Sequence, residues 1–469
     1  MHCAEEKKEN SCLPSASCTI LQKHYSGRDL KENHHDVPRR NTSASHVPST
    51  VSIFEMAHAQ LLQQTSKKED GSSFASNPPN TDSGLSPKAS EDFELALLLQ
   101  ESAEMFSERH YERAMELLSL CSLSASPAGS PVQRVVYCFG EALRERIDKE
   151  KGTLPPNRLE GGDEKPFDLE EFLLTPKPSA FVCYQSPPFF QVPQFAGIQA
   201  ILDNVKSANK VHLIDIGIKI GSHWAILMQA LANIGDCPLE LLKLTAVGTS
   251  KQMVEEIGKR LSSFAAENMK FPFSFKAVVS EMKDLSEDLF ELDTNEVVAV
   301  YSEYSLGGTL AWPDHLEAVL RLIRRLNPCV MIVIETEANT NVPIFMDRFN
   351  ESLFLYAALF DYLEVCMGRD NQYRIAFEGL LLRKIIRNTI TCEGDERTFR
   401  NVRLEVWRDL FEKFAIKETE LSESSLYQAN LMADKSHGFC TLDMNRKGLI
   451  IKWKGTPIVF ASAWKFHHE

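Results

Sequence analysis

Between residues 211 and 335, five short apolar runs alternate with longer stretches of helical periodicity. The runs predicted as strands are residues 211–216, 241–247, 273–279, 297–302 and 329–335. Helices are predicted between and after them, at about residues 223–234, 251–265, 313–326 and 344–364. Runs that are apolar throughout indicate a sheet whose two faces are both covered. The alternation therefore predicts an α/β fold, a doubly wound parallel sheet of the Rossmann-like type with right-handed crossovers.

The C-terminal region has a different pattern. Residues 440–444 and 448–453 flank the turn-forming Asn445-Arg446-Lys447, and residues 458–461 form a third extended run. Strands joined by so short a turn pair antiparallel. We therefore expect an antiparallel edge on the sheet.

Helical spacing of apolar residues starts at Asp92, before the α/β unit. Ser130 and Pro131 predict the N-cap and the first position of the clearest amphipathic helix in the chain. These patterns predict a mostly helical cap over residues 91–200 and a mostly Rossmann-like core over residues 201–469.

Residues 1–90 are rich in Ser, Asn, Pro, Lys, Glu and His, and only residues 51–62 gather apolar side chains. Such a composition does not offset the entropy lost on ordering, so we expect this region to be disordered. Residues 51–62 could fold as a short helix on a partner, but the brevity of the stretch favours an incidental cluster.

The overall composition excludes several classes of protein. Hydrophobic residues make up 43% and charged residues 25%, which is typical of a globular protein, and the net charge of −14 argues against a bulk cationic role on nucleic acid or membranes. No run approaches the roughly 18 apolar residues of a membrane span, and the polar N-terminus predicts an intracellular protein. The eleven cysteines contain no CxxC pair, so we expect reduced thiols and no zinc site.

The turn after the first predicted strand is the position where doubly wound folds bind nucleotide cofactors. Asp215, Gly217 and Gly221 are similar to the acidic, glycine-rich loop of S-adenosylmethionine-dependent methyltransferases, but Lys219 replaces the central glycine. The next strand also lacks a terminal acid for the ribose, since it ends in Gly248-Thr249-Ser250. We therefore favour a site without a cofactor.

A structural interpretation of the same turn is simpler. Asp215 would accept hydrogen bonds from nearby backbone, the two glycines would permit tight geometry, and Ser222 would cap the following helix. His212, between apolar neighbours, is predicted to be a core histidine with satisfied hydrogen bonds.

Several segments together resemble the plant GRAS family of transcriptional regulators, in the DELLA and scarecrow-like group. The sequence Val211-His212-Leu213-Ile214-Asp215 resembles the family's VHIID motif, and the flanking regions 195–210 and 297–326 resemble its leucine-rich regions. Similarity to its PFYRE and SAW motifs falls on Pro343, Arg348 and Glu351, and on Trp453, Ser462, Ala463 and Trp464.

The resemblance implies a methyltransferase-like Rossmann core with a helical cap, used in the nucleus for binding proteins and not for catalysis. It also implies partners among DNA-binding transcription factors, including zinc-finger proteins, and homo- or heterodimers with other GRAS proteins. The DELLA N-terminal motifs are absent from residues 1–90, and residues 301–310 depart from the second leucine-rich region. The alternatives are an active S-adenosylmethionine-dependent methyltransferase and a factor that binds DNA directly.

Basic residues bear on the DNA alternative. Arginines and lysines cluster at residues 321–325, 383–387 and 397–403, either as a phosphate-facing groove or as solvated faces paired with Glu393, Glu396 and Glu405. We favour the solvated faces, with DNA contacted mainly through partners.

The remaining motif residues are predicted to be structural. Trp407, Trp453 and Trp464 have enough apolar neighbours for core packing. Arg348 and Glu351 are spaced i, i+3 on a predicted helix and could pair with each other.

Overall fold

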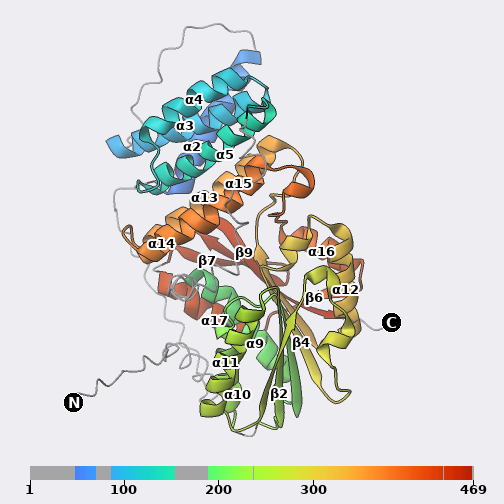
Figure 1. Ribbon diagram of the computed structural model, residues 1–469. Helices are drawn as coiled ribbons and strands as arrows, with labels where there is room; N and C mark the ends of the chain where they lie inside the picture. Colours follow the sequence, from blue (N-terminus) through green and yellow to red (C-terminus); the bar gives the residue numbers. More distant parts are fainter. Residues whose placement is uncertain (1–47, 70–85, 154–187, 236, 437, 467–469) are drawn as a thin grey trace, which may run out of the picture.

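The protein is described by a computed structural model of residues 48–69, 86–153, 188–235, 237–436 and 438–466 (Figure 1). These residues contain a nine-stranded sheet of order β3-β2-β1-β4-β5-β9-β8-β7, with β6 paired to β9. The strands are β1 (Lys210–Ile216), β2 (Leu241–Gly248), β3 (Phe273–Val279), β4 (Val297–Glu303), β5 (Val330–Thr336), β6 (Ile416–Thr419), β7 (Cys440–Asn445), β8 (Gly448–Trp453) and β9 (Thr456–Phe466).

The strand directions confirm the predicted architecture. Strands β1 to β5 pair in parallel, whereas β9 runs antiparallel to β5, β6 and β8, and β7 runs antiparallel to β8. The sheet is therefore doubly wound with an antiparallel edge. Strand β6 was not predicted, because its four residues include only one apolar side chain.

Helices lie on both sides of the sheet and at one end of it. They are α2 (Thr50–Glu69), α3 (Pro87–Ser107), α4 (Tyr111–Ser124), α5 (Pro131–Glu150), α9 (Pro188–Val205), α10 (Ser222–Ala232), α11 (Lys251–Asn268), α12 (Pro313–Leu326), α13 (Phe345–Met367), α14 (Gln372–Ala376), α15 (Arg383–Thr391), α16 (Leu404–Glu412), α17 (Glu423–Ala433) and the π-helical turn η4 (Phe377–Leu382). The predicted N-cap of α5 is confirmed, since Ser130 and Gln133 form a reciprocal capping box.

Side-chain alternation along the central strands separates two apolar cores. Leu213 and Tyr301 face a core shared with α9, α10 and α11, while Ile214 and Val300 face a second core shared with α12 and α16. Successive side chains point to opposite faces of a strand, so runs that are apolar throughout fill both layers.

The predicted boundary between cap and core is wrong at residue 200. Helix α9 packs on the sheet against β5 and β9, whereas α13 and α15 pack against the cap helices α2 and α5. Figure 1 shows α2–α5 at one end of the molecule, with α13 and α15 between them and the sheet. The cap is thus assembled from two distant parts of the chain, a pairing that local periodicity does not encode.

The prediction of disorder over residues 1–90 is wrong for Thr50–Glu69 and for the first turn of α3. Val51, Phe54, Ala57 and Leu61 form a buried stripe on α2, which packs against α3 and α13. Gln100 on α3 also donates a 2.9 Å hydrogen bond to the Phe54 carbonyl. The stripe is short, but tertiary partners bury it. Residues 1–47 and 70–85 lie outside the described residues.

A buried polar cluster joins the cap to α13. Arg134 on α5, 1% exposed, donates to Glu364 at 2.5 Å and to Glu378 of η4 at 3.3 Å. Arg374 on α14 donates to the second oxygen of Glu378 at 2.5 Å. We call these four residues the cap junction.

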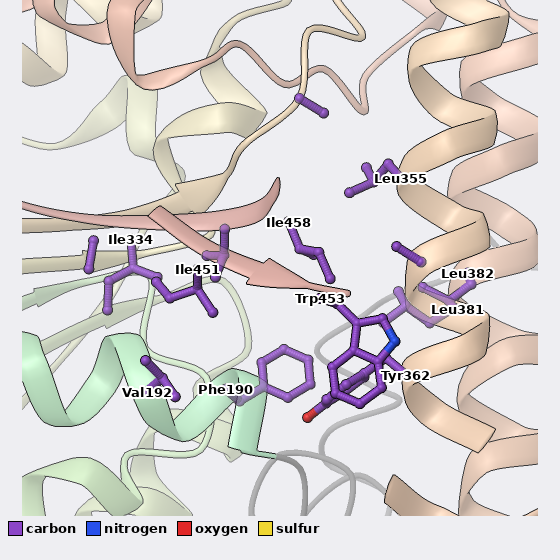
Figure 2. Close-up of a cluster of buried hydrophobic side chains, with 14 of the residues drawn as sticks. Phe190, Val192, Ile334, Leu355, Tyr362, Leu381, Leu382, Ile451, Trp453 and Ile458 are labelled. Atoms are coloured by element: carbon purple, nitrogen blue, oxygen red, sulfur yellow. The ribbon is translucent and has the colours of Figure 1, made fainter. Parts of the chain in front are cut away.

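Apolar side chains continue the connection from the cap side to the sheet. Figure 2 shows Phe190 of α9, Tyr362 of α13 and Trp453 of β8 gathered between the helix and the strands. The Tyr362 and Trp453 rings meet edge to face at 4.9 Å. Within the described residues the cysteines are free thiols, as predicted, and no helix is long and apolar enough to cross a membrane.

Candidate functional site

The turn after β1 has the tight geometry that its glycines predict. Gly217 has a φ of 89° and Gly221 a φ of 72°, in the left-handed region that glycine adopts without strain. The prediction that Ser222 caps α10 is wrong. Gly221 occupies the N-cap position in a left-handed conformation, and Ser222 is already the first helical residue.

Asp215 is buried, but its hydrogen bond differs from the predicted backbone contacts. Its Oδ2 accepts a 2.8 Å hydrogen bond from the Trp224 indole and lies 3.5 Å from Nε2 of His223. The His223 ring stacks on Tyr301 with centroids 4.7 Å apart. Side chains from α10 and β4 therefore enclose the carboxylate that a cofactor loop would offer to a ligand.

Two further acids, which the sequence analysis did not single out, end the neighbouring strands. Glu303 of β4 accepts hydrogen bonds from Gln194 at 2.9 Å and from the Tyr301 hydroxyl at 3.2 Å, and burial raises its pKa. Glu335 of β5 accepts from the Gly307 N–H at 3.1 Å. Burial raises the pKa of Glu335 to about 7 against the opposing Gly307 bond and the charge of Lys219. The sequence signal that could have identified Glu303 and Glu335 is that each lies at the carboxyl end of a predicted strand.

We call the space at the carboxyl ends of β1, β4 and β5 the β1 crevice. Ser305 crosses it, because its hydroxyl donates to the Gly217 carbonyl at 3.3 Å and a Cβ added to Gly217 would lie 2.2 Å from Ser305 Oγ. Ile218 and Trp224 are also at most 1% exposed. At the end of β2, Ser250 caps α11 where an acid would hold a ribose. These residues do not fit an adenosyl cofactor.

The residues of the VHIID-like segment contact other parts of the protein interior. Val211, Leu213 and Ile214 are buried in the cores. His212 Nε2 lies 2.8 Å from Thr245 Oγ1, and Nδ1 lies 3.2 Å from Glu296. Burial lowers the pKa of His212 to about 3, so the ring is neutral near pH 7. The histidine is in the core, as predicted, but the prediction of satisfied hydrogen bonds is wrong for Nδ1, which has no hydrogen-bond partner among the described residues.

Arg348 and Glu351 do not pair with each other. Arg348 is fully buried, forms an ion pair with Glu393 and donates to backbone carbonyls, including that of the exposed Pro343 at 3.2 Å. Glu351 pairs with Arg403 instead. The Arg348 side chain points into the protein, away from Glu351. Its acidic partner, Glu393, belongs to the segment that follows α15.

The tryptophans are core residues, as predicted. Trp407, Trp453 and Trp464 are all buried. The Trp464 indole donates to Ser462 at 2.9 Å, while Ala463 of β9 is buried against the sheet. These contacts fix the final strand in its antiparallel register with β5.

Most of the basic side chains considered for phosphate binding have acidic partners, although not the predicted ones. Arg383 pairs with Glu141 of the cap. Other such pairs are Arg387–Glu145, Arg321–Glu317 and Arg325–Glu287. Arg397 is buried and donates to the Thr340 carbonyl. Pairing across elements weakens the case for a continuous phosphate-facing stripe.

A sequence model of the GRAS domain family matches residues 95–465. The chain belongs to the GRAS domain family. DELLA protein RGL1 of Arabidopsis thaliana is 31% identical over 78% of this chain and 68% of its own length. Protein SCARECROW of Ipomoea nil is 31% identical over 91% of this chain and 50% of its own length. The family that the motifs suggested is confirmed.

A solved GRAS-family relative has a similar fold. The crystal structure of SCL7 from Oryza sativa matches with a TM-score of 0.67 and 26% identity, over 75% of this chain and 94% of that one. The present chain spans 68%, 64% and 56% of the length of the DELLA proteins RGL1, RGL3 and GAIP-B.

The GRAS motif residues do not meet at one site. Asp215 lies in the β1 crevice, whereas Ser462 and Trp464 lie on β9, beyond β4 and β5 in the sheet. Glu351, however, lines a cavity with the turn that follows Trp453. The GRAS segments similar to PFYRE and SAW thus share a surface feature that the sequence analysis missed.

Proposed function

We propose that this GRAS protein is a transcriptional regulator that acts in the nucleus as a non-enzymatic protein scaffold. Family membership supports a role in transcription regulation. Its partners would be DNA-binding transcription factors, with the zinc-finger type expected, and other GRAS proteins in homo- or heterodimers. The chain would reach DNA mainly through these partners.

The observation that carries this proposal is the filled β1 crevice. The Trp224 indole donates a hydrogen bond to the Asp215 carboxylate, and the Ser305 hydroxyl donates one to the Gly217 carbonyl. Both contacts lie where a doubly wound fold would otherwise hold a nucleotide. A sheet that has lost its ligand recess still offers rigid outer surfaces to other proteins. The net charge of −14 and the paired arginines favour recruitment by partners over direct contact with phosphates.

Chromatin immunoprecipitation tests this proposal when it is repeated without the DNA-binding partner. We expect promoter occupancy to be lost when the partner is removed, because the chain makes no sequence-specific contact of its own. The matched control is purified protein on naked promoter DNA. Salt-dependent, sequence-specific binding there would favour the direct DNA-binding alternative and contradict tethering.

An S-adenosylmethionine-dependent methyltransferase is the second candidate, favoured by the strand order and by Asp215 with Gly217. Titration calorimetry with S-adenosylmethionine distinguishes the two functions. We expect no heat of binding, since side chains of the chain occupy the crevice. Micromolar binding that disappears in Asp215→Ala would establish the second candidate.

A further inference from the structure

A cavity of about 460 Å³ lies where the cap, α13 and the antiparallel edge meet. Val51 and Glu55 of α2 line it from the cap, Phe354 lines it from α13, and the turn over residues 454–457 lines it from between β8 and β9. Glu337, just after β5, also lines it. We call this cavity the edge groove.

The two cations that line the edge groove already have anionic partners. Arg403 forms an ion pair with Glu351, which also lines the groove. The Nζ of Lys454 lies 2.7 Å from Oδ2 of Asp361. Each of these cations therefore already has a carboxylate partner of its own.

Two acids of the edge groove remain without a cationic partner. Glu337 is only 9% exposed, and its Oε2 accepts a 2.9 Å hydrogen bond from the Leu404 N–H. Across the described parts of the chain, its Oε1 has no hydrogen-bond partner, and neither Glu337 nor Glu55 has a cation within 4.0 Å. Burial raises the pKa of Glu337 even though the Leu404 N–H and the more distant charges of Arg403 and Arg408 lower it, so these contacts do not fully offset the cost of burying the carboxylate.

The walls define the shape and chemistry of a suitable occupant. Val51, Phe354 and Pro457 present apolar surface beside the two carboxylates. A Lys or Arg side chain combines an aliphatic stem with a cationic end, so it matches both parts of the groove. In the described ranges no group of three His, Cys, Asp or Glu side chains could hold a metal ion.

We infer that the edge groove binds a Lys or Arg side chain presented by a segment of a partner protein, with Glu337 and Glu55 as its anionic contacts. This inference rests on the proposed scaffold function and names the chemistry of one partner segment. A bound cation would offset the charge of Glu337. Removing that cation from the partner segment should therefore weaken binding, because it leaves a buried carboxylate without a charge partner.

Selection of random peptides displayed on phage against the full chain tests this inference. We expect the selected peptides to share a Lys or Arg at one position, and its replacement by Gln to weaken binding at least about tenfold in fluorescence anisotropy. The paired variant Glu55→Gln with Glu337→Gln should cause a similar loss. Glu337→Gln retains an acceptor for the Leu404 N–H, so the fold is expected to persist.

Glu267→Gln, on the exposed face of α11, is the matched control and should leave the affinity unchanged. Glu55→Lys, at an exposed position of α2, gives a second test if Glu337→Gln fails to fold. Peptides without a shared basic residue, or an affinity that neither groove variant changes, would overturn the inference.

Other occupants give distinct results. A dimer that sediments as a monomer after Glu55→Gln and Glu337→Gln would assign the groove to a second copy and contradict a partner segment. Tighter peptide binding after Arg39→Gln and Arg40→Gln would assign it to the chain's own N-terminal sequence, with the same consequence. Failure of peptide selection with intact promoter occupancy would remove this inference and leave the proposed function standing.

Discussion

The β1 crevice and the cap junction both bury carboxylates, but they compensate the charge differently. In the crevice, Glu335 accepts a hydrogen bond from the uncharged Gly307 N–H, and burial raises its pKa to about 7. In the cap junction, burial opposes ionisation of Glu364 too, yet hydrogen bonds from Arg134 and Arg369 hold its pKa below the ordinary value. The donor accounts for part of the difference, since a cation favours the ionised form more than a neutral N–H does. Depth of burial accounts for the rest, because burial raises the pKa of Glu378 in the same junction although Arg134 and Arg374 both lower it.

The two regions differ in role: side chains fill the β1 crevice, whereas the cap junction connects segments that are distant in the sequence. The crevice acids Asp215 and Glu303 are held by the neutral side chains of Trp224 and Gln194. The cap junction instead joins α5 to α13 and η4 through Arg134, across more than 200 residues of sequence. Charge pairing therefore specifies how the cap docks, while neutral donors close the crevice.

Arg134→Met is expected to have the largest effect on this comparison. It leaves the half-buried Glu364 with Arg369 alone and the buried Glu378 with Arg374 alone, which should lower the free energy of unfolding by roughly 3 kcal/mol. Denaturant unfolding followed by circular dichroism measures the change. Arg113→Met, at an exposed ion pair with Glu116, is the control, with an expected cost of at most about 1 kcal/mol. Equal losses in the two variants would show that burial of the junction does not matter.

Glu335→Gln should have a smaller effect that depends on pH. Folding raises the pKa from 4.5 to about 7, so the folded state binds the proton more tightly and stability falls as the pH rises through this window. The variant should therefore gain roughly 2–3 kcal/mol over the parent at pH 8 and little near pH 4.5. Urea unfolding at the two pH values checks this, with Glu267→Gln as the exposed control. A gain that is the same at both pH values would argue against a raised pKa.

Gly217→Ala tests whether the crevice is closed at its glycine. The new Cβ would lie 2.2 Å from Ser305 Oγ at a backbone φ of 89°, so we expect a loss of about 1–3 kcal/mol in unfolding free energy. Adding Ser305→Ala removes the Oγ contact but leaves the Cβ of residue 305 at 2.8 Å, so it should recover only part of the steric cost, and Ser305→Gly should recover more. A double-mutant cycle separates these contributions from the backbone strain. Gly235→Ala, where a Cβ meets nothing within 4 Å, serves as the control. An unchanged stability in Gly217→Ala would mean that Ser305 does not close the crevice.

The sequence predicted every strand of the sheet except β6, because each of the other strands carries its own apolar signal. Predicted residues 273–279 and 448–453 coincide with β3 and β8, and predicted residues 313–326 coincide with α12. Strands that are apolar throughout are recognisable without their neighbours. The site was harder to predict, since Glu303 and Glu335 acquire their meaning only when β4 and β5 lie side by side.

The amino-acid sequence by itself determined the α/β alternation, the antiparallel edge and the altered glycine loop, because these depend on residues close together in the chain. Tertiary structure decided which groups meet. It paired Arg348 with Glu393 where the local spacing favoured Glu351, placed α13 against the cap, and brought Glu55 and Glu337 to one groove. Periodicity reports which face of an element is buried, whereas the partner of a buried charge depends on how elements distant in sequence pack together.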